Sequence, residues 1–378
     1  MIYFDNAATG FPKSKSVISA TEKAMYISGN SGRSGHIYSI RASEILYSVR
    51  ESIAELFGTS SERIILCPSA TYALNIGIKG LKKRNSKVLI SDLEHNSVIR
   101  PSSSEEPALF FEVDINDDKK TIENFKQSLF CNSKNEISLV VITHASNICG
   151  RILPVNEISY ICREENIPII LDASQTAGYI PINFSETPVD VICIPGHKGF
   201  YGPMGTGALI INPDSNLEFK TIIEGGTGIH SQDLYMPNEL PERLEAGTMG
   251  VHDFAGLHKA IRECTYVINQ MKDKYKYIIK ELKKNDKIML YGISYENIDK
   301  YMPIILFNGL NISSQSFAQK LFEKGFCVRS GFHCAPTAHE KLGTGEQGAI
   351  RISIGKSNTF VECRKLIKSI SEISKKEN

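Results

Sequence analysis

The chain has 378 residues, of which 42% are hydrophobic and 22% charged, so it can bury an ordinary core and form about two domains. Its 43 basic and 42 acidic residues leave a formal net charge of +1. This balance gives no electrostatic reason to expect a nucleic acid or an anionic membrane as partner. The start of the chain lacks a basic and apolar leader, and no apolar run is long enough to span a bilayer. We therefore expect a cytoplasmic protein.

Short apolar runs alternate with amphipathic segments up to about residue 250. Buried parallel strands are predicted at 64–66, 87–90, 138–142 and 169–171, and further strands of the same sheet at 191–194 and 207–211. The helices predicted between them cover 43–57, 72–82 and 155–165. This alternation predicts a large α/β domain with a mainly parallel sheet over residues 16–250.

The pattern changes after about residue 251. A long, lysine-rich helical stretch at 254–284 is followed by a strand at 303–307, a helix at 315–324, a strand at 327–329 and a last helix at 359–375. We expect these elements to form a smaller α+β domain from residues 1–15 and 251–378.

The nine cysteines are scattered from Cys67 to Cys363 without a C-x-x-C pair, which does not match a disulfide or zinc framework. We interpret them as reduced thiols. Most lie in apolar runs, as Cys193 does, and are expected to fill the core. Cys334 is the exception, because it lies on a polar loop.

Lys198 lies on a glycine-flanked turn after the apolar run 191–194, and Asp172 ends an earlier run. A lysine and a strand-end carboxylate are what an aldehyde cofactor such as pyridoxal phosphate requires, because the amine forms a Schiff base and the acid keeps the pyridine nitrogen protonated. A lone lysine on a polar turn is more often simply solvated. The neighbouring motifs favour the cofactor.

Several polar residues follow predicted strands and could surround such a cofactor. Ser69, Ala70 and Thr71 precede a helix and could hold a phosphate, although small hydroxyl residues are common helix caps. His95 could stack on a flat ring, or be a surface histidine. Asn147 and Gln175 could donate hydrogen bonds to the ring oxygen or a substrate carboxylate, or be turn residues; the full set is Ser69, Ala70, Thr71, His95, Asn147 and Gln175.

A second cluster lies near the C-terminal end, where Cys334 follows Arg329 and His333 on a loop bounded by glycine and proline. An exposed cysteine beside positive charge is typical of a nucleophilic thiolate. An inert loop cysteine is the simplest alternative. A metal site with His333 and His339 has poor ligand spacing and no evident fourth ligand. Arg351 has the planar fork that grips a carboxylate in two places, although a lone arginine is more often a surface ion-pair residue.

Taken together, these motifs resemble the class V aminotransferase-fold cysteine desulfurases over nearly the whole chain. The short Arg-Ser-Gly-x-His-Cys loop is similar to the SufS-like, selenocysteine-lyase-like branch. The motifs that carry the resemblance are Tyr3 to Ala8, Glu94-His95-Asn96, Thr143 to Asn147, Asp172 to Gln175, Gly196-His197-Lys198, Glu245 to Thr248 and Arg329 to Cys334.

The resemblance implies a fold type I enzyme that binds pyridoxal 5'-phosphate. Lys198 would be the Schiff-base lysine, Asp172 the partner of the pyridine nitrogen and His95 the residue stacked on the ring. The other cofactor-binding positions would be Ala70, Thr71, Asn147, Gln175, His197 and, reaching the neighbouring subunit, Thr248. Pro195 stands where the family often has a hydroxyl residue, so one phosphate hydrogen bond must be missing or come from elsewhere.

The implied reaction removes sulfur from L-cysteine, giving L-alanine and a persulfide on Cys334, with a homodimer and a sulfur-acceptor protein as expected partners. Substrate-binding positions would be His36, Asn147, Arg329 and Arg351. Alternatives on the same scaffold are a selenocysteine lyase acting on L-selenocysteine, another C–S lyase or an aminotransferase. A sulfur-carrier subunit without turnover would not need lysine, acid and cysteine together. We expect the polar stretch 337–346 to form a lid.

Overall fold

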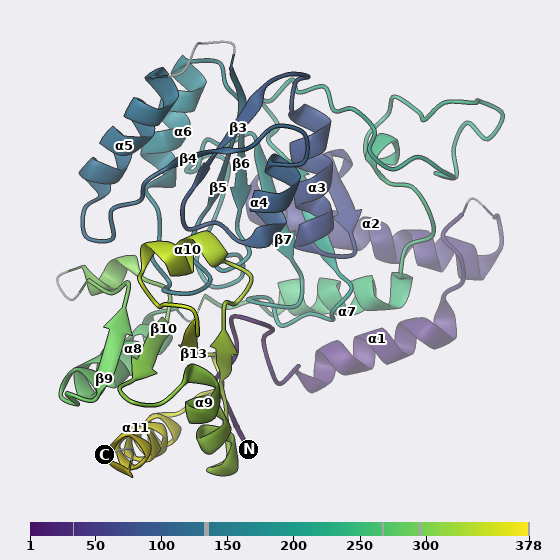
Figure 1. The fold of residues 1–378 in the computed structure, drawn as a ribbon. Helices are drawn as coiled ribbons and strands as arrows, with labels where there is room; N and C mark the ends of the chain where they lie inside the picture. Colours follow the sequence, from purple (N-terminus) through teal and green to yellow (C-terminus); the bar gives the residue numbers. More distant parts are fainter. Residues whose placement is uncertain (33, 132–135, 267, 295–296, 377–378) are drawn as a thin grey trace.

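A seven-stranded sheet forms the centre of the larger half of the computed structural model, which describes residues 1–32, 34–131, 136–266, 268–294 and 297–376 (Figure 1). The strands β7, β6, β5, β3 and β4 pair in parallel, whereas β8 is antiparallel to both of its neighbours. This confirms the predicted mainly parallel sheet. In sheet order the strands are β2 (Ile64–Cys67), β8 (Gly207–Ile211), β7 (Val191–Pro195), β6 (Ile169–Asp172), β5 (Ile137–Thr143), β3 (Lys87–Ser91) and β4 (Leu109–Phe111).

Both faces of this sheet are covered by helices, which explains why its strands are continuous apolar runs. All seven residues of β5 are buried. Leu139 and Val141 pack in the cluster that contains α3, and Val140 and Ile142 pack in the cluster on the opposite face. The first face carries α3 (Ala70–Leu81) and α4 (Asn96–Ser102); the other carries α2 (Ile37–Phe57), α5 (Asp118–Phe130), α6 (Val155–Glu164) and α7 (Val251–Arg262), with α1 (Lys15–Ile27) packed on α7.

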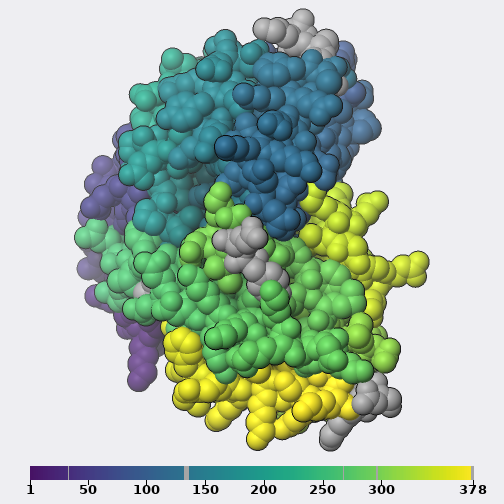
Figure 2. All heavy atoms as spheres, turned by 90° about the vertical axis from the view of Figure 1, so that its left-hand side faces the viewer, coloured from purple at the N-terminus to yellow at the C-terminus, as the bar shows by residue number. Residues whose placement is uncertain are grey.

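A four-stranded antiparallel sheet organises the other half of the molecule. Its order is β12 (Arg329–Gly331), β13 (Ala349–Ser353), β10 (Ile304–Gly309) and β9 (Ile288–Tyr291). Its core is shared with α8 (Ile268–Lys283), α9 (Ser314–Glu323) and α11 (Phe360–Lys376). The two halves pack together along a broad boundary (Figure 2). Short elements complete the fold: α10 (Pro336–Lys341), η1 (Ser61–Arg63), η2 (Glu242–Leu244) and η3 (Ile298–Lys300).

The N-terminal segment belongs to the smaller half, although the chain then leaves for the large sheet. Strand β1 (Ile2–Tyr3) pairs in parallel with β11 (Phe326–Cys327), and Phe4 is fully buried in the core of the four-stranded sheet. In Figure 1 the N-terminus accordingly lies beside this half. The next residues, Asp5 to Ala8, therefore run between the two sheets.

The prediction of a single helical stretch at 254–284 is wrong in one respect, because the structure has two helices there. Helix α7 ends at Arg262 and α8 begins at Ile268. Phe254 and Leu257 of α7 pack in the core of the large sheet, whereas Tyr275 of α8 packs in the core of the small one. One straight helix could not serve both cores, so the chain breaks between them. Helix α7 thus lies with the large sheet, beyond the boundary expected at residue 250.

The helices carry charged side chains along their length. Helix α2, for example, spans 21 residues and includes Arg41, Glu44 and Arg50. Within the described ranges, none of the helices combines the length and apolar character that crossing a bilayer requires.

Candidate active site

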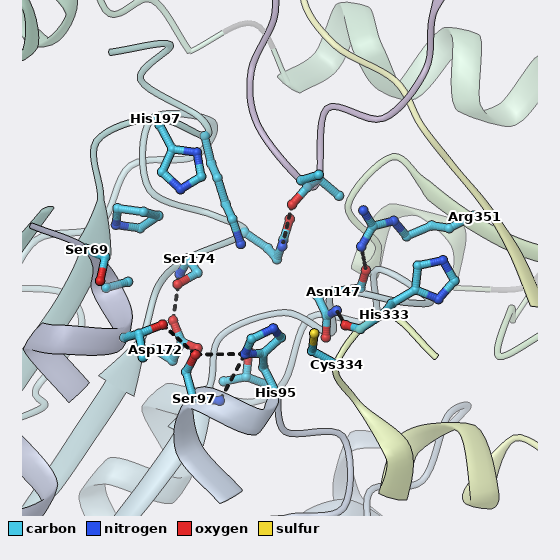
Figure 3. A pocket seen from close by; sticks show the side chains of 18 of the residues that line it. Ser69, His95, Ser97, Asn147, Asp172, Ser174, His197, His333, Cys334 and Arg351 are labelled. Carbon is cyan, nitrogen blue, oxygen red and sulfur yellow. Dashed lines mark hydrogen bonds between the residues drawn. The ribbon is translucent and has the colours of Figure 1, made fainter. Parts of the chain in front are cut away.

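A cavity of about 220 Å³ lies at the carboxyl ends of the parallel strands, where the two halves meet. It brings together residues from both halves that are far apart in the chain (Figure 3). Two predicted site residues, His36 and Thr248, do not line it in the single chain, and His36 is exposed at the start of α2. The predicted residues that do line it are Ala70, Thr71, His95, Asn147, Asp172, Gln175, His197, Lys198, Arg329, Cys334 and Arg351.

Lys198 and Asp172 face this cavity from neighbouring strands of the large sheet. Asp172 is the last residue of β6, is 3% exposed, and accepts a hydrogen bond from the Ser174 N–H at 2.9 Å. Lys198 lies on the turn after β7, where Gly199 packs so closely on the Ala177 carbonyl that a Cβ atom would collide with it. Burial lowers the pKa of Lys198 to about 8, with Arg351 and Arg329 adding to the effect and Asp172 opposing it. A substantial fraction of the amine is therefore uncharged near pH 8.

His95 caps α4, and this role determines its protonation. Its Nδ1 accepts the Ser97 backbone N–H at 3.0 Å, so the neutral ring carries its proton on Nε2. Burial lowers the pKa of His95 to about 4, and the Lys198 ammonium adds to this. The ring is therefore neutral at physiological pH, carries one N–H on Nε2 and lines the cavity.

The N-terminus of α3 forms another wall of the cavity. Ser69 caps the helix, since its Oγ accepts the Tyr72 N–H at 3.2 Å, and the Thr71 hydroxyl lies 2.7 Å from Ser97 Oγ. The ordinary cap that we considered for this motif thus exists. It still orients the first residues of a helix of 12 residues toward the cavity, where the helix dipole favours an anion. His197 lies beside it and bonds Thr9 at 3.1 Å.

Arg351 is buried at the centre of β13 and binds groups from both halves. Its Nη1 donates to the Asn147 carbonyl at 2.9 Å, and its Nη2 donates to Asp5 Oδ1 at 2.7 Å. Its Nε has no hydrogen-bond partner among the described residues, although the side chain is only 2% exposed. Asp5 therefore neutralises this arginine. Sequence reasoning missed that role, although Asp5 lies within one of the quoted motifs.

The amide side chains of the cavity are partly engaged by the protein. Asn147 donates its Nδ2 to the His333 carbonyl at 2.9 Å, and its Oδ1 is buried without a partner in the part of the chain that the structure describes. Gln175 donates one N–H to the Ala7 carbonyl at 3.1 Å. Asn147 thus uses one of its two N–H groups within the protein and keeps the other as a donor, as Gln175 does.

Cys334 enters the cavity on residues 329–334, which we call the thiol loop. The residue is exposed, and its sulfur points to the side of the cavity that holds His95 and Asn147 (Figure 3). The Asn96 N–H donates to the Cys334 carbonyl at 2.7 Å, which ties the loop to the start of α4. The thiol is therefore accessible both to the cavity and to solvent.

The two histidines that we considered as metal ligands bond each other instead. His333 Nδ1 lies 3.2 Å from His339 Nε2, and the rings are nearly parallel with their centres 5.4 Å apart. Each nitrogen of this pair is directed at a hydrogen-bond partner. The expected lid at 337–346 includes all but the first residue of α10, whose His339 is 2% exposed. It therefore packs against the thiol loop.

Glu94 lies beneath the cavity and was not singled out from the sequence. It is fully buried, and its Oε1 accepts hydrogen bonds from the Ser91 hydroxyl at 2.5 Å and the Thr143 N–H at 2.7 Å. Burial raises the pKa of Glu94 to about 8, despite these bonds, and Asp172 adds to the rise. The carboxyl is therefore mostly protonated at neutral pH. Its place directly before His95 is the only signal in the sequence.

Comparison with known proteins places these residues in context. A family model described as "Aminotransferase class-V" matches residues 2–366. The chain is 29% identical over 384 residues to a "Probable cysteine desulfurase" of Methanothermobacter thermautotrophicus, covering 99% of this chain and 94% of the relative. It is 28% identical over 351 residues to a "Cysteine desulfurase IscS" of Dictyoglomus turgidum, covering 90% and 83%.

A solved structure extends this likeness to the fold. The apo structure of the cysteine desulfurase from Thermococcus onnurineus NA1 aligns with a TM-score of 0.89 and 28% identity, covering 99% of this chain and 95% of that chain. The likeness over nearly all of both chains confirms the predicted fold class.

Proposed function

This chain belongs to the aminotransferase class-V family, and we propose that it is a cysteine desulfurase, which converts L-cysteine to L-alanine and leaves the sulfur as a persulfide on Cys334. One observation carries this proposal. The Lys198 amine and the Cys334 thiol line the same cavity, although they come from different sheets. A lysine alone would serve many reactions of this fold. A thiol beside it supplies the sulfur acceptor.

Family membership implies pyridoxal phosphate as the cofactor, and the residues present fit it. A lysine amine with a lowered pKa, a buried carboxylate, a flat neutral imidazole and a helix N-terminus line one cavity. When bound, the cofactor supplies a ring that stabilises negative charge on the substrate carbon. We assign Lys198 to the aldehyde, Asp172 to the pyridine nitrogen, His95 to the ring face, Gln175 to the ring oxygen, and Ala70, Thr71 and His197 to the phosphate.

The substrate end is assigned to residues on the other side of the cavity. Arg351 has a buried Nε without a partner in the described structure, and this N–H would bind the carboxylate of cysteine. Arg329 lines the cavity and adds positive charge near it. The neutral form of Lys198, available near pH 8, would accept the α-proton and later return a proton.

Cys334 would then take the sulfur. Its thiolate attacks the substrate sulfur, a sulfur–sulfur bond forms, and the carbon–sulfur bond breaks with its electron pair left on carbon. Protonation of that carbon completes L-alanine. The enzyme retains the sulfur on Cys334, whose exposure would allow a sulfur-acceptor protein to collect it.

The finer assignments follow from the same features. We place the chain in the SufS-like branch because its thiol loop is short, and selenocysteine would be a second substrate. We infer a homodimer, supported by the large exposed apolar side chains Tyr26, Leu234 and Tyr235. In it, His36 and Thr248 would complete the site of the neighbouring subunit. A cytoplasmic location is supported by nine free thiols.

The test is to measure alanine and sulfide from L-cysteine with the purified, cofactor-loaded protein and an added thiol, which reduces the persulfide and releases its sulfur as sulfide. Cys334→Ala is expected to abolish sulfide formation from cysteine while leaving the cofactor absorbance unchanged. Cys131→Ala, which removes another exposed thiol, is the matched control and is expected to behave as wild type. If wild type released no alanine from cysteine but did release it from selenocysteine, the lyase alternative would replace the desulfurase.

A further inference from the structure

Two consecutive residues of the thiol loop have a left-handed backbone. His333 has φ +50° and Cys334 has φ +57°, a region that side chains other than glycine rarely adopt because Cβ then crowds the carbonyl oxygen. Such a conformation persists only where the surroundings hold it. The direction of the Cys334 side chain therefore depends on the contacts that hold the loop.

The backbone at these two residues is held by the Asn147 side chain and the Asn96 N–H. The His333 side chain, which also lines the cavity, adds two further contacts. Its Nε2 lies 3.3 Å from the Arg329 carbonyl, and its Nδ1 lies 3.2 Å from His339 Nε2. His339 in turn places its Nδ1 2.8 Å from Thr344 Oγ1. All three side chains are nearly buried, with residue exposures of 5%, 2% and 3% for His333, His339 and Thr344.

The Arg329 carbonyl determines which atom donates in each hydrogen bond of the series from His333 through His339 to Thr344. Because the Arg329 carbonyl can only accept, His333 Nε2 carries the proton, and the Nδ1 of the neutral ring accepts from His339 Nε2–H. His339 Nδ1 then accepts from the Thr344 hydroxyl. Burial lowers the pKa of both histidines, which agrees with neutral rings.

We propose that His339 and Thr344 are positioning residues, which hold the His333 ring and thereby fix the direction in which Cys334 presents its sulfur. Neither residue lines the cavity, so they act through the loop and not on the substrate. The proposal rests on the proposed function for what the sulfur does there. It gives the stretch 337–346 a role as a brace for the thiol loop.

Two substitutions of His339 separate its hydrogen bond to His333 from its hydrogen bond to Thr344. In His339→Gln the amide nitrogen reaches the position of Nε2 and still donates to His333, whereas the bond to Thr344 is lost. In His339→Asn the amide oxygen occupies the position of Nδ1 and still accepts from Thr344, whereas the bond to His333 is lost. Both variants remove an imidazole and keep one hydrogen bond, so they differ chiefly in their link to the thiol loop.

We expect His339→Asn to lower kcat for alanine formation about tenfold or more, since misplacing a reacting group by about 1 Å can cost up to about 100-fold. His339→Gln is expected to stay within about threefold of wild type, because the link is preserved. KM for cysteine and the cofactor absorbance are expected to remain unchanged in both variants. A loss of kcat that accompanies loss of bound cofactor would contradict the proposal.

The hydroxyl of Thr344 has a matched control on α10. Thr344→Val removes the donor to His339, and we expect a drop in kcat of about three- to tenfold. Thr337→Val removes a buried hydroxyl that has no hydrogen-bond partner within the described residues, and is expected to retain wild-type kcat. Equal behaviour of the two valine variants would overturn the proposal, even if His339→Asn failed to fold.

A second readout does not depend on desulfurase activity. The rate at which iodoacetamide alkylates Cys334, located by mass spectrometry in the cofactor-loaded protein, is expected to rise at least about threefold in His339→Asn and to stay near wild type in His339→Gln, since a released loop exposes more of the thiolate nucleophile. If that difference appears while wild type does not desulfurate cysteine, the proposed function fails and the positioning role stands. Equal alkylation rates in both variants would refute the positioning role.

Discussion

The cofactor side and the thiol side of the cavity are built in different ways. Asp172 ends β6 and Lys198 follows β7, two central strands of the large sheet whose backbones are hydrogen-bonded on both sides. Cys334 follows β12, an edge strand of the small sheet, and its residue is exposed. Groups that must hold charge or a proton at one place thus lie on rigid elements. The Cys334 thiol, which we propose transfers sulfur to an acceptor, lies on a loop that is held by side chains.

Removing the Lys198 amine is expected to change alanine formation more than any other substitution on either side of the cavity. Lys198→Ala should lower alanine formation at least about 10³-fold, because both the cofactor attachment and the acid–base group are lost. Reaction of Cys334 with iodoacetamide should be little affected, because the thiol loop is held by other residues. Lys15→Ala, at an exposed lysine, is the control. Joint loss of thiol reactivity in Lys198→Ala would show that the two sides are not independent.

Removing the strand-end acid is expected to have the next largest effect. Asp172→Asn should lower kcat about 10²-fold, through loss of the fixed charge that we assign to the pyridine nitrogen. The substitution should also lower the pKa of Lys198. In wild type, borohydride trapping of an aldehyde on Lys198 should be half-maximal near pH 8, since the neutral amine reacts. The midpoint should fall in Asp172→Asn, because Asp172 favours the ammonium form. An unchanged midpoint would contradict this electrostatic coupling.

A backbone change in the thiol loop tests whether kcat depends on the loop being held in place. Gly331 has φ +104° with open space around it, so Gly331→Ala should cost about 1–2 kcal/mol of stability. We expect kcat to fall about tenfold with the cofactor absorbance unchanged. Gly325→Ala, at φ +89° and also with open space, should cost similar stability without lowering kcat. Similar kcat values for the two variants would mean that the loop tolerates displacement.

The smallest effect on activity is expected at Glu94, which lies beneath the rigid side. Its pKa is about 8 in the folded chain and ordinarily about 4.5, so the folded state holds a proton that the unfolded state has lost between these pH values. Folding stability from this group therefore falls as pH rises through that window. Glu94→Gln should match wild type near pH 5 and be more stable by at least about 1 kcal/mol at pH 9, as measured by urea unfolding. Glu123→Gln, at an exposed glutamate, should show no such gain.

The large sheet could be predicted well because each of its strands leaves a signal within a few consecutive residues. Strands buried on both faces are continuous apolar runs, and the runs at 64–66, 87–90, 138–142, 169–171, 191–194 and 207–211 all became strands. Polar residues directly after such runs gather at one edge of a parallel sheet, which is why Lys198, Asp172 and His95 could be proposed together. Strand β4 and helices α1 and α5 were missed: β4 has only three residues, α1 buries only Val17 and Ala24, and α5 buries only Thr121, Phe125 and Leu129.

The chain's sequence by itself determined the strands, the glycine-flanked lysine turn and the residues available for chemistry, since each depends on neighbours within a few positions. Only the tertiary structure decided that Asp5 pairs with Arg351, 346 residues away, that the helical stretch breaks to serve two cores, and that His339 and Thr344 brace the thiol loop through His333. These contacts arise where elements from two sheets pack together, and no local periodicity specifies which side chains will meet there.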